Sequence, residues 1–129
     1  MERGDEMSWN LTTDRPIFAQ IMDIISQNII SGRYAPGEKL PSVRDLAAQA
    51  AVNPNTMQKA LAELEKTGLV FAKRTSGRYI TEDHTIIEEL KSSLAQKKIR
   101  EFLQSMENLG ISRQETAALL AEILEGEKS

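Results

Sequence analysis

A cluster of short polar side chains occupies positions 53–58 of the 129-residue chain: Asn53, Asn55, Thr56 and Gln58. Side-chain amides of Asn and Gln can pair with the edge of adenine, and Thr can donate a hydrogen bond or offer its methyl group to thymine. The residues that follow have helical spacing, which places this cluster at the start of a helix. The pattern predicts base reading in duplex DNA. Asn53 has a second interpretation, as a helix cap alone.

Basic residues surround this cluster in the sequence, although the net charge of the whole chain is −3. Positions 31–80 hold eight Lys and Arg against four acids, whereas positions 83–129 hold six against nine. This asymmetry indicates an anionic partner for the first segment. The expected phosphate contacts are Arg44, Lys59, Lys73, Arg74 and Arg78, with Arg44 also a candidate base reader.

Other kinds of chemistry have little support in the sequence. The chain has no cysteine and one histidine, His84, so it lacks the usual nucleophile–histidine pairs and metal-ligand clusters. The adjacent Glu88 and Glu89 fall on a predicted helix surface, without a cleft to shift their pKa values. We therefore expect no enzyme, catalytic residue, metal or cofactor. With no long apolar run and a charged first segment, the sequence predicts no membrane partner and a cytoplasmic location.

The elements that must position the cluster are predicted from caps and periodicity. A first helix should begin at Pro16, with Asp14 near its cap, and end at Gly32. After a turn at 35–38 and a short strand near Leu40, a second helix should begin at Val43, capped by the preceding serine.

The third helix should begin at the Asn53-Pro54 pair and end at Gly68. Its start should point free N–H groups and the positive end of its dipole toward phosphate. Strands at 69–73 and 78–80, joined by a turn at 74–77, should follow as a hairpin. The predicted fold class is mainly α with a small β-hairpin, a winged helix-turn-helix.

A helical tail is predicted after residue 82, with one long helix ending at Gly110 and a last helix opened by a capping box at 112–115. So much apolar surface should pack on the rest of the chain or on a second copy. The expected dimer contacts are Leu90, Leu94, Phe102, Leu103 and Leu120. The predicted organisation is an irregular segment at 1–13, a DNA-binding domain at 14–82 and a dimerisation tail at 83–129.

The segment 14–82 resembles the N-terminal domain of the GntR family of bacterial transcription regulators. The resemblance is carried by Pro36-Gly37-Glu38-Lys39-Leu40-Pro41-Ser42-Val43-Arg44, by Asn53-Pro54-Asn55-Thr56-Met57-Gln58-Lys59-Ala60-Leu61 and by Leu64-Glu65-Lys66-Thr67-Gly68. The Asn-Pro-Asn-Thr sequence and the short tail are similar to the YtrA-like subfamily, in which the tail dimerises and the regulators often repress operons for ABC transporters.

This resemblance implies DNA contacts at matching positions, namely Arg44, Pro54, Asn55, Thr56, Gln58 and Gly77. Pro54 departs from a family position that often holds arginine, which removes a guanine-reading side chain. The hairpin turn keeps one glycine, Gly77, where the family usually has Gly-x-Gly, so a shallower contact with the minor groove is expected.

The predicted function is a homodimeric repressor that binds a palindromic operator in double-stranded DNA. A winged helix that binds another protein, without sequence-specific DNA binding, is the alternative. DNA binding should weaken steeply with salt, whereas a protein-docking module should have little affinity for DNA even at low salt. A small-molecule effector is left open by the sequence, and with only 47 residues after Glu82 it would have to bind at an interface.

Overall fold

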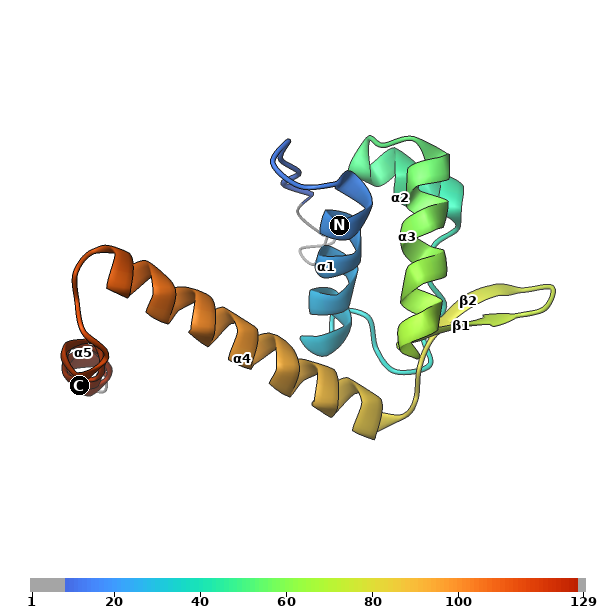
Figure 1. Ribbon diagram of the computed structural model, residues 1–129. Helices are drawn as coiled ribbons and strands as arrows, with labels where there is room; N and C mark the ends of the chain where they lie inside the picture. Colours follow the sequence, from blue (N-terminus) through green and yellow to red (C-terminus); the bar gives the residue numbers. More distant parts are fainter. Residues whose placement is uncertain (1–8, 128–129) are drawn as a thin grey trace. The chain divides into compact units, whose positions relative to one another are not determined.

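The computed structural model describes residues 9–127 and divides into two compact units, the first running to Leu90 and the second starting at Lys91. The described residues form three helices, a β-hairpin and two further helices, which are labelled in Figure 1. Their bounds are α1 Ile17–Ile30, α2 Val43–Ala50, α3 Pro54–Thr67, β1 Val70–Lys73, β2 Gly77–Ile80, α4 His84–Asn108 and α5 Arg113–Glu127. This order confirms the predicted fold class, a mainly helical chain with a small β-hairpin.

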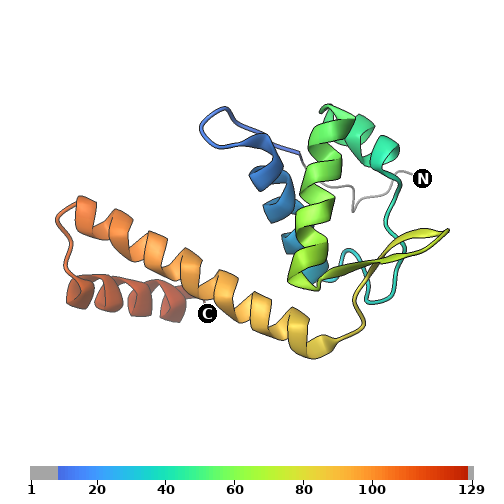
Figure 2. The same cartoon turned by 45° about the vertical axis from the view of Figure 1, so that its right-hand side comes forward.

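The first unit is built on one hydrophobic core beneath α1, α2, α3 and the hairpin. Helices α1 and α3 lie alongside each other in Figures 1 and 2. The buried apolar side chains are Ile21, Ile25, Ile29, Tyr34, Leu40, Leu46, Ala47, Ala50, Met57, Ala60, Leu61, Leu64, Leu69, Val70, Ile80 and Ile87. Each helix contributes residues at helical spacing, so the period read from the sequence identifies the faces that meet.

The segment before α1 is fastened to the helix by the buried side chain of Gln20. Its Nε2 donates to the carbonyl oxygens of Thr12 and Arg15 at 2.9 and 2.8 Å, and its Oε1 accepts from the Thr12 backbone N–H at 2.8 Å. Trp9 and Leu11 pack against the core, as their apolar character predicts. Because both the donors and the acceptor of this buried amide form hydrogen bonds, Gln20 holds residues 12–15 against α1. A buried amide without these partners would destabilise the fold.

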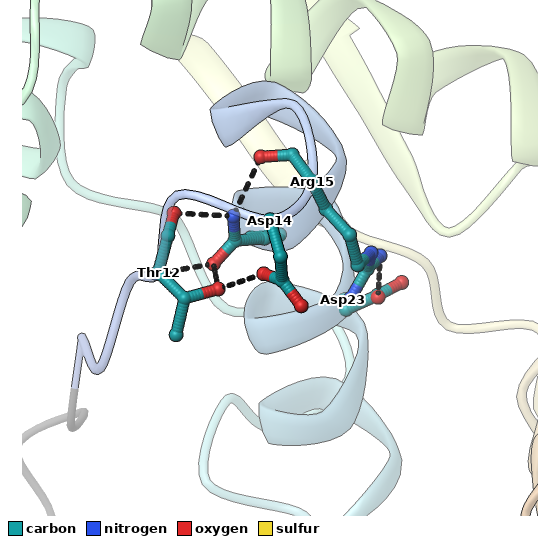
Figure 3. Close-up of polar contacts among 5 residues, drawn as sticks. Thr12, Asp14, Arg15 and Asp23 are labelled. Atoms are coloured by element: carbon teal, nitrogen blue, oxygen red, sulfur yellow. Dashed lines mark hydrogen bonds and ion pairs between the residues drawn. The ribbon is translucent and has the colours of Figure 1, made fainter.

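Exposed polar contacts complete this N-terminal region (Figure 3). Arg15 forms an ion pair with Asp23 at 2.6 Å, and the Thr12 hydroxyl donates to Asp14. The hydrogen bond from Thr12 lowers the pKa of Asp14. Asp14 therefore bonds within the preceding loop, and α1 begins at Ile17, one residue later than predicted, with Pro16 at the cap position.

A tight corner connects α2 to α3. Ser42 Oγ accepts from the Asp45 N–H at 3.1 Å and caps α2, as predicted from the serine. The helix ends at Ala50, and the residue that follows, Ala51, is in the left-handed region with φ 58°. Helix α3 then begins at Pro54 and is stopped by Gly68, whose φ of 85° favours glycine, so both predicted ends of this helix are confirmed.

The hairpin is extended by a third segment into a small sheet. Strands β1 and β2 pair antiparallel, with Phe71 opposite Tyr79 and Lys73 opposite Gly77. The Leu40 N–H donates to the Arg78 carbonyl and the Ile80 N–H to the Glu38 carbonyl, both at 2.9 Å. The strand predicted near Leu40 is therefore present as a short bridged segment along β2.

The second unit contains the C-terminal part of α4, a turn and α5. Ser112 and Glu115 form a reciprocal capping box: Glu115 N–H donates to Ser112 Oγ, and Ser112 N–H donates to Glu115 Oε1, each at 3.1 Å. Arg113 pairs with Glu107 across the turn at 2.8 Å. Within residues 9–127, neither of these two helices nor any other is long and apolar enough to cross a membrane.

Candidate DNA-binding surface

The predicted base-reading side chains lie together on the first turns of α3. Asn53, Asn55 and Gln58 are exposed and Thr56 is half-buried, whereas Met57 and Leu61 on the other face are buried. The helix is held by its apolar face against the core, so its polar start is available to a partner. An amphipathic helix presented in this way is the reading element of a helix-turn-helix.

The N–H groups at this helix start are already engaged, which corrects the expectation that they would be free for phosphate. Pro54 has no N–H, the Asn55 N–H donates to Asn53 Oδ1 at 2.7 Å, and the Thr56 N–H donates to the Asn53 carbonyl at 3.0 Å. Asn53 is thus a cap in this structure. The positive end of the helix dipole remains at this surface.

The first turn of α2 lies across an open groove from the turn of the hairpin. The groove has a volume of about 680 Å³ and is lined on one side by Ser42, Val43 and Asp45, and on the other by Ser76 and Gly77. Arg44 is exposed on the same turn of α2. A Cβ built at Gly77 would lie 3.2 Å from the Lys39 side chain, so glycine allows this close approach.

The other basic side chains predicted to hold phosphate differ in their surroundings. Lys59 Nζ lies 4.0 Å from the centre of the Phe18 ring, and Lys73 Nζ lies 4.5 Å from that of Tyr79. Arg78 Nε forms an ion pair with Glu65 at 2.5 Å, and Arg74 is exposed. Three of these cations therefore have aromatic or acidic neighbours within the unit, as cation–π contacts and ion pairs.

Sequence reasoning did not identify Phe18, Glu65 and Tyr79 as neighbours of the predicted phosphate-binding groups. Phe18 is on α1 and Glu65 is on the C-terminal half of α3, far along the chain from the cations that they meet. Only the contact between Lys73 and Tyr79 could have been predicted from the sequence, because side chains of adjacent antiparallel strands meet across a hairpin. The remaining pairs depend on tertiary packing.

The predicted dimer contacts are in a different part of the chain. Leu90 packs partly against the core of the first unit. Leu94 and Leu103 are half-buried, and Phe102 and Leu120 are exposed by 41% and 43%. Four of the five side chains therefore belong to the second unit and keep apolar surface open to solvent.

Fold and site together define a winged helix-turn-helix transcription regulator. The model of the family described as "Bacterial regulatory proteins, gntR family" matches residues 18–80. The HTH-type transcriptional regulator YhcF of Bacillus subtilis is 37% identical over 114 residues, covering 88% of this chain and 94% of that protein. The chain therefore belongs to the GntR family. This confirms the prediction that it is a transcription regulator and not an enzyme.

Other relatives and solved structures agree with this assignment. The HTH-type transcriptional repressor YtrA of B. subtilis is 33% identical and covers 84% of either chain. A GntR family transcriptional regulator from Listeria monocytogenes has a TM-score of 0.79 and 38% identity, over 87% of this chain and 98% of that one. The AraR DNA-binding domain in complex with operator ORE1 has a TM-score of 0.51 and 27% identity, over 59% of this chain and 93% of that one.

Proposed function

We propose that the chain is a sequence-specific repressor that binds a palindromic operator as a homodimer. The single observation that carries the proposal is the start of α3, where Asn55, Thr56 and Gln58 project from a helix whose opposite face is buried in the core. These side chains address base edges, and a major groove is wide enough to admit the helix.

The proposed phosphate contacts surround this start, on α2, on α3 and in the hairpin. They are Arg44, Lys59, Lys73, Arg74 and Arg78. Gly77 at the turn of the hairpin, and Asn53 and Pro54 at the start of α3, are proposed as further DNA contacts. Arg44 has the clearest support because it is exposed on the turn of α2 that lines the groove beside the hairpin. The ammonium groups of Lys59 and Lys73 would bind phosphate either from their positions over the Phe18 and Tyr79 rings or after a change of side-chain rotamer.

A second copy of the chain is proposed to cover the apolar surface of the second unit. Helix α5 carries one broad apolar face, made by Leu119, Leu120, Ile123 and Leu124, all of them exposed. An apolar helix face that stays in water within one chain is stabilised when a second copy covers it. A twofold dimer would present two α3 helices to successive major grooves about 34 Å apart.

The relatives support repression and a cytoplasmic site of action. YtrA is named a repressor, and the AraR domain was solved with an operator. We propose that this chain likewise acts on bacterial DNA in the cytoplasm, at an operon whose genes include those of a transporter, as in the subfamily that the sequence resembles.

Selection of bound duplexes from a random pool, followed by fluorescence anisotropy, tests this function. The wild-type chain should enrich a palindrome and lose about 10³-fold or more in affinity between 50 and 200 mM salt if it makes six or more phosphate contacts. Gln58→Ala should relax base preference at one position in each half-site. The matched control is Gln27→Ala, an exposed glutamine on α1, which should leave the selected sequence unchanged.

The protein-docking alternative makes the opposite prediction in the same assay. A module that binds protein would enrich no duplex and would show little affinity even in dilute salt. An equal loss for Gln58→Ala on every sequence would leave DNA binding in place and remove base reading from the proposal.

A further inference from the structure

Glu65 is the one acidic side chain that bonds to a predicted phosphate-binding cation in the described residues 9–127. Its Oε2 lies 2.5 Å from Arg78 Nε, which joins the C-terminal half of α3 to β2. The Glu65 side chain is 32% exposed and that of Arg78 18% exposed, so this pair is less solvated than an ordinary surface pair.

The geometry of the pair leaves part of the guanidinium for another acceptor. Arginine has five N–H donors in a planar fork, and Glu65 takes the one at Nε. The four donors on the two terminal nitrogens remain, and this is the end of the group that binds phosphate in bidentate fashion. A carboxylate at Nε restricts the rotation of the side chain and thereby aims that end.

We propose that Glu65 is a positioning residue for DNA binding: it holds Arg78, and with it strand β2, in the orientation that meets the phosphate backbone. The inference rests on the proposed DNA-binding function. A carboxylate on a helix that approaches DNA repels phosphate, so the loss of its charge alone would strengthen DNA binding. Removal of the Glu65 carboxylate weakens operator binding instead, because Arg78 is no longer held in place.

A matched control is available on the same helix. Glu63 also bears one negative charge, and it forms an ion pair with Lys66 at 2.9 Å. The Lys66 side chain is 72% exposed and lies on α3 itself, so this pair does not connect the helix to the hairpin. Glu63→Gln and Glu65→Gln therefore change the net charge equally, two residues apart. The first should leave operator affinity unchanged or slightly raised.

Operator affinity of the full chain, measured by anisotropy across a salt series, tests the proposal. Glu65→Gln should bind about tenfold more weakly, with the slope of log affinity against log salt reduced by about 0.9, the loss of one phosphate contact. Glu65→Asp keeps the charge but shortens the reach, and it should also weaken binding. In an Arg78→Ala background, Glu65→Gln should cause no further loss.

Several outcomes would overturn the positioning role. Equal affinities for Glu65→Gln and Glu63→Gln would do so, as would an undiminished effect of Glu65→Gln in the Arg78→Ala background. If Glu65→Gln is destabilised in thermal unfolding, Glu65→Asp decides, and wild-type affinity for it would reject the proposal. Failure of the wild-type chain to bind any duplex would instead overturn the DNA-binding function itself.

Discussion

The two units of the chain differ in how they bury their apolar residues. The first closes a core of sixteen buried apolar side chains. In the second, among described residues 91–127, Thr116 is the buried side chain. By contrast, Ile99 and Phe102 on α4, Leu109 in the turn after it and four large apolar residues on α5 are exposed by 41% to 73%. This exposed apolar surface is what the proposed second copy would cover.

With the proposed dimer, the two units obtain stability from different sources. The first is complete within one chain, and its polar surface is free to serve recognition. The second unit has a well-formed capping box, but its apolar helix faces are exposed. Its stability should therefore depend on association with a second copy, and thus on protein concentration.

Leu103→Asp should separate the dimer and weaken operator binding by about 10²–10⁴-fold, because two linked half-site contacts become independent. Sedimentation should report monomers. Gln104→Asp places the same charge on the neighbouring residue, which bonds to Asn108 on the polar side of α4, and it should remain dimeric. A dimer that persists in Leu103→Asp would locate the interface elsewhere.

Leu61→Ala should lower the free energy of unfolding of the first unit by about 2–5 kcal/mol, the cost of a cavity at a fully buried leucine. Urea denaturation followed by circular dichroism measures it. Leu109→Ala, in the second unit at a leucine that is 73% exposed, should change the free energy of unfolding of that unit by less than about 0.5 kcal/mol. Similar losses in the two variants would remove the contrast between the units.

Arg44→Ala should cost about 1–3 kcal/mol of operator binding if this residue makes a good bidentate contact with a base. It is exposed, so stability should change little. Anisotropy on the selected operator gives the loss, and thermal unfolding gives the control. Unchanged affinity would remove Arg44 from the reading surface.

Ser112→Ala removes the cap of α5 and should destabilise that helix by about 1 kcal/mol. If a second copy stabilises the second unit as proposed, the effect should appear as a midpoint of unfolding that shifts with protein concentration. The same substitution at Ser42, which caps α2 in the first unit, should give a loss independent of concentration.

Local signals in the sequence were enough to predict most of the elements. Asn53 and Pro54 begin α3, Gly68 ends it, and Ser112 with Glu115 opens α5, because each of these effects depends on neighbours within three or four residues. The buried faces of α2 and α3 followed from the same periodicity.

Contacts between elements were the part that sequence could not supply. Glu65 and Arg78 are thirteen residues apart, and Phe18 meets Lys59 from another helix, so only the packing of α1 and β2 around α3 brings them together. Gln20 gave no signal either, since an isolated glutamine in a helix is usually exposed. For the DNA-binding surface, the residues were predicted but their neighbours were not.

Ala51, at the corner before α3, has a consequence for the speed and selectivity of recognition. Its φ of 58° costs alanine about 1–2 kcal/mol, a penalty that glycine would escape. Alanine, however, has only a narrow well in that conformation, so the pivot between α2 and α3 is stiff before any target is met. Little conformational entropy is lost at this corner when α3 binds DNA. A duplex of the wrong shape cannot be accommodated by a change in the angle between α2 and α3.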